Sequence, residues 1–212
     1  MMNIPTNFHA IDHPLLMQKL RYLMDSQTNA PEFRRLIREM SILLTYEALR
    51  DWETEELEIS TPTGPATVRT LTNHPIVISI LRAGNGMVDG VIEALPLAPV
   101  GHIGIYRDRN LDSTVEYFLR LPEDIQGASV LLVDPIIATG DTMCASVSRL
   151  RKFGVGEIRV LTILASATGL NKLSATDGNV SVWGLRLEES LDERGHLTPG
   201  PGDVSNRYFN AN

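Results

Sequence analysis

Cysteine is almost absent from the chain, which has 212 residues and only Cys144, so no disulfide bond can form within it. Basic clusters are missing too: the net charge of −7 is evenly spread, which argues against a surface dedicated to nucleic acid. No apolar run approaches the roughly 18 residues that a membrane span needs, and the first residues show no signal peptide. We therefore expect a cytoplasmic protein that binds neither nucleic acid nor membrane.

Histidine is scarce as well, and its five copies do not form a metal site. His9 and His13 are four residues apart, but no cysteine or further histidine joins them, whereas zinc sites normally have about three or four protein ligands. The chain also lacks the G-x-x-x-x-G-K-[ST] sequence, which argues against a Walker A nucleotide hydrolase. The sequence thus predicts no metal that is held by the protein itself.

The remaining composition is that of an ordinary globular protein, with 43% hydrophobic and 21% charged residues. No repeat, low-complexity tract or linker divides the chain, and its length favours one domain with elaborations. We predict a single domain over residues 1–212. It consists of N-terminal helices (1–54), a protruding β-hairpin arm (55–71), a core (76–185) and a C-terminal loop (186–212).

Apolar residues recur in helical stripes and in short buried strands. One amphipathic helix is expected after Pro14 and a longer one from about Pro31. Alternating stretches on both sides of Pro-Thr-Gly at 62–64 predict the hairpin. Because strands then alternate with helices, we expect an α/β fold, a parallel sheet flanked by helices. The further strands are predicted at 76–81, 100–106, 130–133, 160–164 and 180–185, a second hairpin-like stretch at 113–121, and helices at 87–95 and up to Gly154.

The stretch VLLVDPIIATGDT, residues 130–142, leads a buried strand directly into polar residues. The apolar run suits a strand that is covered on both faces of a parallel sheet, so an ionised Asp134 has no packing role there. The carboxyl end of such a strand is where open α/β sheets bind ligands. We expect Asp134 to accept hydrogen bonds from the two vicinal hydroxyls of a ribose.

The residues after Asp134 have the features of a phosphate-binding loop. Ala138-Thr139-Gly140-Asp141-Thr142 leads into a helix and directs backbone N–H groups, the positive helix end and two hydroxyls at one point. Gly140 lets the backbone approach a ligand, and Thr139 and Thr142 can donate to phosphate oxygens. Two other interpretations stay open: a plain helix N-cap at Asp141 or Thr142, and a phosphoacceptor receiver fold, whose acidic cluster should lie near the first strand.

Arginines follow two other strands at the same edge of the predicted sheet. Arg82, with Gly84 and Gly86, forms a cationic, glycine-rich strand-to-helix turn, which suits a diphosphate because a guanidinium binds phosphate bidentately. Arg107 ends the next strand, in the stretch GIYRD. The alternatives are a purely structural bend at Arg82 and a solvated side chain at Arg107.

The C-terminal stretch LDERGHLTPGPGDVSNRYF is rich in glycine and proline. We expect it to be a loop of fixed shape and not a core element, and loops of this kind carry function. Asp203 lies between Gly202 and Val204, where backbone groups are accessible. An exit loop without any ligand is the alternative.

Together these motifs resemble the phosphoribosyl-diphosphate signature of type I phosphoribosyltransferases, and the strand-Asp-Pro-x-x-Ala-Thr-Gly form is similar to that of the uracil phosphoribosyltransferase family. The resemblance extends over nearly the whole chain, from His13-Pro14-Leu15 through LLTYEA, ILRAGNGM, GIYRD, VDPIIATGDT and PGPGD to Phe209. It implies transfer of a phosphoribosyl group from phosphoribosyl diphosphate to uracil, which gives UMP and diphosphate, as in pyrimidine salvage.

The resemblance also implies the role of each motif. Arg82 and Arg107 contact the diphosphate, and Asp134 and Asp203 complete the catalytic set. Uracil meets backbone groups of the C-terminal loop, which is chemically reasonable because its edge alternates acceptors and donors. The residues implied for uracil are Leu197, Gly202, Asp203 and Val204. Those implied for phosphoribosyl diphosphate, besides the two arginines and Asp203, are Asp134, Pro135, Ile136, Ile137, Ala138, Thr139, Gly140, Asp141 and Thr142.

Several residues depart from what the family usually has. Asp141 stands where glycine is usual and brings a negative charge close to a phosphate, so we expect its side chain to point outward or to cap the helix. Asn85 and Pro201 replace apolar residues. Val204 stands at a variable position that often holds alanine, and Ser205-Asn206 replaces a Gly-acid pair. The departures after residue 200 all concern the expected base pocket.

We further expect Mg²⁺, carried on the oxygens of the substrate. The hairpin at 55–71 has the form of an arm that can pack on a second subunit, and the resemblance implies a homodimer or higher oligomer. The sequence does not choose among a dimer, a tetramer and a GTP-dependent assembly, so GTP stays open as an effector. Two other functions also stay open: a non-catalytic sensor of phosphoribosyl diphosphate, and a transferase for another base.

Overall fold

A mostly parallel seven-stranded sheet lies at the centre of the computed structural model, which describes residues 7–108 and 113–211. Its strand order is β1-β11-β9-β7-β4-β5-β6, and among the described strands of this sheet β6 alone runs antiparallel to its neighbour. The predicted parallel sheet is thus confirmed. Its strands are β1 Phe8–Ala10, β4 Ile76–Leu81, β5 Val100–Asp108, β6 Ser113–Arg120, β7 Val130–Val133, β9 Ile158–Leu161 and β11 Ser181–Gly184.

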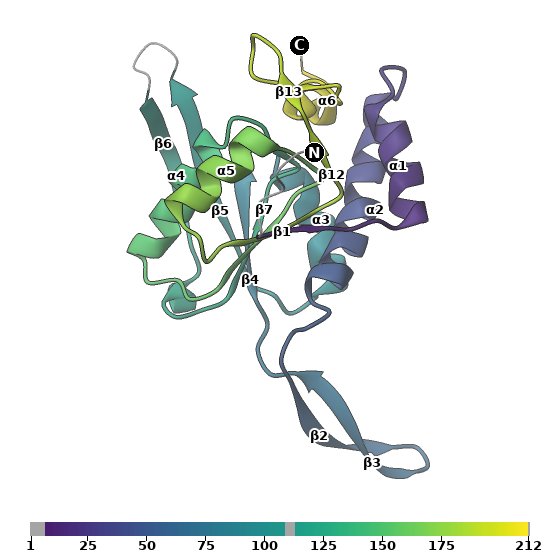
Figure 1. The fold of residues 1–212 in the computed structure, drawn as a ribbon. Coiled ribbons are helices and arrows are strands. Elements are labelled where there is room, and N and C mark those ends of the chain that lie inside the picture. The colour runs from purple at the N-terminus through teal and green to yellow at the C-terminus, as the bar shows by residue number, and fades with distance from the viewer. Residues whose placement is uncertain (1–6, 109–112, 212) are drawn as a thin grey trace.

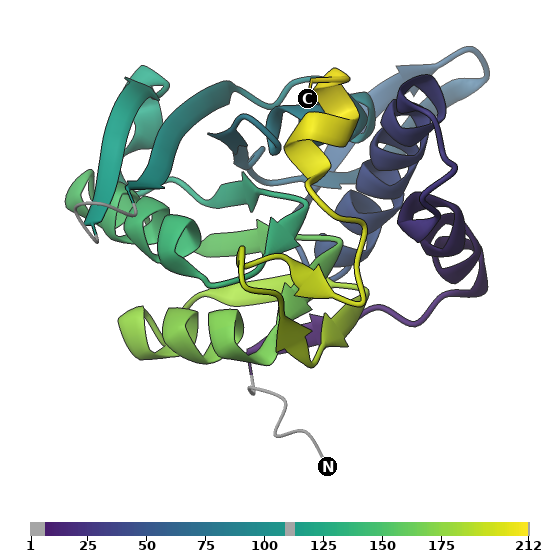
Figure 2. The same cartoon turned by 90° about the horizontal axis from the view of Figure 1, so that it is seen from above.

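Helices cover both faces of the sheet (Figure 1 and Figure 2). The side chains of β7 alternate between the two sides: Val130 and Leu132 pack with one group of helices, and Leu131 and Val133 pack with the other. This explains why the strand reads as a continuous apolar run, since both of its faces are buried. The first group is α4 Asp141–Lys152 and α5 Ala167–Thr176, and the second is α1 Pro14–Met24, α2 Ala30–Ala48 and α3 Asn85–Ala94.

The arm is a two-stranded hairpin, β2 Thr54–Thr61 and β3 Gly64–Leu71, that projects away from the body. Thr61 pairs with Gly64, so Pro62 and Thr63 form a two-residue turn. Figure 1 shows that the arm leaves the end of the molecule opposite to the C-terminal segment, which is coloured yellow. The hairpin therefore takes no part in the edge of the sheet where ligands are expected.

The strand predicted over residues 160–164 is in fact two strands. The chain leaves the main sheet after β9, and β10 Leu164–Ser166 joins a small parallel sheet with β8 Ile136–Ile137 and β12 Arg186–Glu188. The physical reason is local: the N–H groups of Ile163 and Leu164 both donate to the carbonyl of Pro135, at 3.0 and 3.2 Å. These two hydrogen bonds direct the chain out of the main sheet, toward the segment that follows β7.

The C-terminal segment was predicted to be a loop outside the core, which is wrong for part of it. It contains the strands β13 Ser190–Leu191 and β14 Leu197–Thr198 and the helix α6 Val204–Phe209. Leu197 and Val204 are buried with the α1–α3 side of the core. A single 3₁₀ turn, Glu123–Ile125, precedes β7. Within residues 7–108 and 113–211, none of the helices combines the length and apolar character that crossing a membrane requires.

Candidate active site at the carboxyl edge of the sheet

Three adjacent parallel strands end at one edge of the sheet and bring the predicted site residues together. Strands β5, β4 and β7 are neighbours in register, and Arg107, Arg82 and Asp134 lie at or directly after their ends. The backbone of Arg107 pairs with Thr114 in β6. Its side chain lies outside what the structure describes, so its predicted role stays a prediction.

A pocket of about 120 Å³ lies where the phosphate loop was predicted. Gly140, at φ +82°, turns the chain into α4, a left-handed conformation that favours glycine. Pro135 is buried behind the pocket, where its carbonyl binds the start of β10. The pocket is lined by Asp134, Ile136, Ile137, Ala138, Thr139, Gly140, Asp141, Thr142 and Met143, which includes every predicted loop residue except Pro135.

The first turn of α5 supports this loop from behind. The Ser166 hydroxyl donates to the carbonyl of Ala138 at 2.5 Å and accepts from the Gly169 N–H at 2.8 Å. A Cβ atom on Gly169 would lie 2.5 Å from the same carbonyl oxygen, and one on Gly140 would lie 2.8 Å from the Gly169 carbonyl oxygen. The loop and the helix therefore meet backbone to backbone, which fixes the shape of the pocket.

The carboxyl group of Asp134 is not the fully ionised group that the sequence led us to expect. Burial raises its pKa to about 7, while a hydrogen bond from the backbone of Ile136 acts in the opposite direction. The residue directly follows a strand that is buried on both faces, and it is itself only partly exposed. The proton on Asp134 is therefore held to a much higher pH than on an ordinary aspartate.

Asp141 has partners both in the loop and in α5. Its carboxylate accepts a hydrogen bond from the Thr139 hydroxyl at 2.8 Å and forms an ion pair with the ammonium group of Lys172 in α5. It occupies the first turn of α4, and its side chain is only 12% exposed. We expected Asp141 to point outward or to cap the helix, but Gly140 occupies the N-cap position and Asp141 instead faces α5.

Arg82 directly follows β4, and its side chain lies next to α6. Its guanidinium donates to the Asn206 side chain at 3.5 Å and lies 5.9 Å from the centre of the Phe209 ring. The glycines of its turn are required by packing: a Cβ on Gly84 would lie 2.3 Å from the carbonyl oxygen of Val133. Arg82 thus lies between the strand ends and α6, with its charge open to solvent.

A second pocket, of about 200 Å³, is formed by the C-terminal segment. It shares Ile136 and Ala138 with the phosphate pocket, so the two pockets are adjacent. All four residues predicted to meet the base line it, namely Leu197, Gly202, Asp203 and Val204. The other lining residues are Ala83, Gly195, His196, Pro201 and Ser205.

Two side chains fix the shape of this segment. Asp203 caps α6, because one of its carboxylate oxygens accepts from the Asn206 N–H at 2.8 Å. Arg207 donates to the carbonyls of Leu23 and Pro201, each at 2.9 Å, and its guanidinium stacks 4.4 Å from the Phe33 ring. The glycine- and proline-rich stretch is therefore held rigidly against α1 and α2.

Sequence reasoning missed several residues of the site. Ser166, Gly169 and Lys172 support the phosphate loop, and His196 lines the base pocket, where its imidazole lies 3.2 Å from the Asp192 carboxylate. The stretch Ser-Ala-Thr-Gly at 166–169 does carry an N-cap signal, since serine opens the helix. No pattern in the sequence indicates that Lys172 reaches Asp141.

This combination of a mainly parallel sheet, flanking helices and adjacent pockets at its carboxyl edge places the fold among the type I phosphoribosyltransferases. The structure of adenine phosphoribosyl transferase from Trypanosoma brucei, in complex with AMP, pyrophosphate and ribose-5-phosphate, is similar at a TM-score of 0.58 and 15% identity and covers 90% of this chain and 88% of that chain. The AQ2163 protein from Aquifex aeolicus is similar at a TM-score of 0.90 and 30% identity, over 95% and 97% of the two chains.

The chain belongs to the uracil phosphoribosyltransferase family, whose model matches residues 10–211. A uracil phosphoribosyltransferase from Staphylococcus haemolyticus is 40% identical over 202 residues, 95% of this chain and 97% of that protein. One from Staphylococcus aureus (strain Newman) is 39% identical over the same shares. The chain is therefore an enzyme of the phosphoribosyltransferase class, and the resemblance of its motifs to this family is confirmed.

Proposed function

We propose that the phosphate pocket holds the phosphoribosyl group of phosphoribosyl diphosphate and that the C-terminal pocket holds uracil, so that the enzyme forms UMP and diphosphate. The observation that carries this assignment is the wall that the two pockets share, Ile136 and Ala138. A ribose whose 5′-phosphate lies in the loop at 138–142 then presents its anomeric carbon to a base in the neighbouring pocket. Asp134, at the strand end, faces the ribose hydroxyls.

Uracil recognition depends on the backbone of the clamped C-terminal segment. Leu197 and Val204 are buried and rigidly packed, so N–H and C=O groups around them have fixed directions. Gly202, at φ +74° with open space around its Cα, exposes its backbone to the pocket. Since uracil offers alternating acceptors and donors along one edge, fixed main-chain groups distinguish it from cytosine without a charged side chain.

The reaction depends on positioning and on charge stabilisation. The C1–oxygen bond to diphosphate breaks as the C1–N1 bond to uracil forms, and C1 has cationic character in between. Arg82 and Arg107 stabilise the departing diphosphate, and Asp134 in its ionised form accepts hydrogen bonds from the ribose hydroxyls. The proton on uracil N1 passes to diphosphate or water, because that ring N–H is acidic enough to need no dedicated strong base.

Mg²⁺ is expected to enter with the substrate. The ion prefers oxygen ligands and gives up its waters reluctantly, so phosphate oxygens and water fill most of its coordination sphere. Asp134 lines the phosphate pocket and provides carboxylate oxygens there, whereas both carboxylate oxygens of Asp141 already have donors. When bound, the ion neutralises charge on the diphosphate.

A steady-state assay of diphosphate release tests the substrate assignment. The purified protein is supplied with phosphoribosyl diphosphate and Mg²⁺ against uracil, cytosine, hypoxanthine, guanine, xanthine and orotate. Release with uracil alone supports the assignment. Release only with another base would show that Val204 and Ser205-Asn206 have changed the pocket, and binding without any release would favour a sensor.

The arm supports a homodimer or higher oligomer. Leu57, Ile59 and Val68 are exposed on it, and Leu57 and Val68 are cross-strand partners, so they form one apolar face. Charged residues such as Glu56 and Arg69 lie on the other face. An isolated hairpin gains little stability in water, so an arm with one apolar face is typical of a surface that a second subunit covers.

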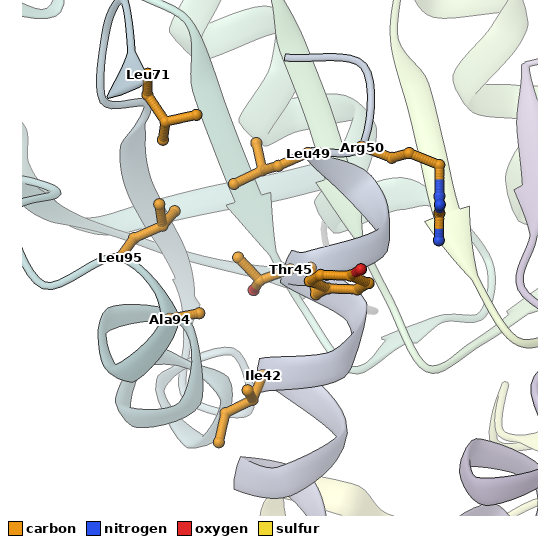
Figure 3. Close-up of a pocket in the computed structure, with 8 residues that line it drawn as sticks. Ile42, Thr45, Leu49, Arg50, Leu71, Ala94 and Leu95 are labelled. Atoms are coloured by element: carbon orange, nitrogen blue, oxygen red, sulfur yellow. The ribbon is translucent and has the colours of Figure 1, made fainter. Parts of the chain in front are cut away.

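An apolar hollow of about 600 Å³ at the root of the arm supports the same assignment. Figure 3 shows Thr45 and Leu49, from the end of α2, pointing toward Leu95 at the end of α3, with Leu71 of the arm nearby. The arm and the hollow are adjacent through Leu71, so a second copy of the chain could cover both. GTP stays a proposed effector of this assembly.

A further inference from the structure

Asp141 brings a negative charge into the pocket that has to hold a phosphate dianion. The residue lines this pocket together with the backbone of Ala138 to Gly140. A carboxylate close to a phosphate repels it, and the repulsion is strong where little water screens the two charges. With only 12% of its side chain exposed, Asp141 has little water around it. The pocket therefore needs something that offsets this charge.

Lys172 is placed to do this. Its ammonium group forms an ion pair with Oδ1 of Asp141, while Oδ2 accepts the Thr139 hydroxyl at 2.8 Å. Both carboxylate oxygens are thus engaged by donors that lie beside the phosphate loop. The side chain of Lys172 is half exposed, so the pair forms without a large desolvation cost for the ammonium group.

The position of Lys172 is fixed by the rest of α5. Ser166 and Gly169 attach the first turn of this helix to the Ala138 carbonyl, and Lys172 lies three residues after Gly169 on the same helix. Residues three apart share one face of a helix, so the face that contacts the loop at Gly169 also carries the ammonium group. The pair with Asp141 follows from this docking.

We propose that Lys172 is a positioning residue for phosphoribosyl diphosphate. By pairing with Asp141 it offsets the carboxylate charge and holds that side chain toward α5, so that the 5′-phosphate can enter the loop. Lys172 acts through Asp141 and has no direct role in the bond exchange. This inference rests on the proposed placement of the 5′-phosphate in the pocket at residues 134–143.

The test measures binding of ribose 5-phosphate by calorimetry and the KM values of both substrates. Lys172→Met keeps the approximate length of the side chain but removes the ion pair with Asp141. We expect it to weaken ribose 5-phosphate binding and to raise the KM for phosphoribosyl diphosphate, both on the order of tenfold. The kcat and the KM for uracil should change less than about twofold. Lys152→Met, at the far end of α4, is the matched control and should change none of these values.

The double variant Lys172→Met/Asp141→Asn separates this role from a structural one. Asparagine keeps the acceptor for Thr139 but carries no charge, so binding should return to within about threefold of the unsubstituted protein. Lys172→Arg should bind normally. Unchanged binding in Lys172→Met, or a double variant as weak as the single one, would overturn the proposal.

Failure of this proposal and failure of the proposed reaction give different results. If the unsubstituted protein releases no diphosphate with uracil, but ribose 5-phosphate binding follows the pattern above, the reaction is wrong and the role of Lys172 stands. If uracil is converted normally and Lys172→Met binds ribose 5-phosphate like the unsubstituted protein, the role of Lys172 is wrong. Thermal melting of each variant shows whether a loss of binding reflects a loss of folding.

Discussion

Gly140 and Gly169 lie where the phosphate loop meets α5, so close that a side chain on either would displace the backbone of the opposite segment. A Cβ on Gly140 would be 2.8 Å from the Gly169 carbonyl oxygen, and a Cβ on Gly169 would be 2.5 Å from the carbonyl oxygen of Ala138. Two segments almost thirty residues apart in sequence are thereby joined at the phosphate pocket. The chemistry of the loop at 138–142 thus depends on a helix that does not line its pocket.

Gly169→Ala should test this dependence. The added methyl group displaces the loop, so we expect a loss of stability of about 1–3 kcal/mol and a higher KM for phosphoribosyl diphosphate. Thermal melting and steady-state kinetics measure the two effects. Gly178→Ala is the control, because its Cβ would meet its nearest neighbour at an ordinary 3.7 Å. Equal effects of the two substitutions would contradict the account.

The raised pKa of Asp134 predicts a pH dependence of activity. In the proposed mechanism the ionised carboxylate accepts hydrogen bonds from the ribose, and burial raises its pKa to about 7. The kcat/KM for phosphoribosyl diphosphate should therefore rise as the pH increases through about 7. In Asp134→Asn the residual activity should lose this step. If kcat/KM of the variant still rises near pH 7, the titrating group is a residue other than Asp134.

The same pKa predicts an effect on stability. The folded protein keeps the Asp134 proton up to a pH of about 7, whereas the unfolded chain releases it near 3.8. Stability is therefore lost as the pH rises between these two values. Asp134→Asn should melt like the original protein near pH 4 and be more stable near pH 8, by about 1–3 kcal/mol. A difference that does not grow with pH would contradict the assigned cause.

Substitution of the arginines tests charge stabilisation of the leaving group. Arg82→Ala and Arg107→Ala should each lower kcat/KM on the order of 10²- to 10³-fold, the usual cost of one such donor. Arg120→Ala is the control, since Arg120 pairs with His102 near the start of β5, away from the carboxyl edge. Unchanged kinetics in either variant would remove that arginine from the site.

A charged substitution on the apolar face of the arm tests whether the arm contacts a second subunit. Leu57→Asp places a carboxylate on the apolar face of the hairpin and should dissociate the oligomer, as measured by sedimentation with and without GTP. Ser60→Asp adds the same charge to an exposed position on the opposite face, which carries Glu56 and Glu58, and should leave assembly unchanged. An oligomer that survives Leu57→Asp would show that the arm is not the contact.

Much of the fold could be predicted because its signals are local. The strand Val130–Val133 and the helix that starts at Pro14 are visible in apolar periodicity and in helix-start residues. The division of the strand near residue 162 could not be predicted, because it depends on bonds from Ile163 and Leu164 to the distant Pro135 carbonyl. Apolar pattern alone does not show which sheet a buried strand joins.

The site could be predicted where function requires a particular residue type in one loop. Residues of the two predicted stretches, 134–142 and 197–204, line two adjacent pockets, and their binding roles stay predictions. Residues that act through long-range contacts were missed. Lys172 reaches Asp141 across 31 positions of sequence, and Arg207 reaches Leu23 across 184. The ionisation of Asp134 was also missed, since it depends on how completely the strand is buried.

A crystal structure of the protein with UMP would test the two-pocket assignment most directly. The account predicts that the phosphate of UMP accepts hydrogen bonds from backbone N–H groups of residues 138–142, that Asp134 contacts the ribose hydroxyls, and that the uracil edge meets the backbone of residues 197–204. A phosphate bound elsewhere, or a base outside the pocket formed by Leu197, Gly202 and Val204, would contradict it.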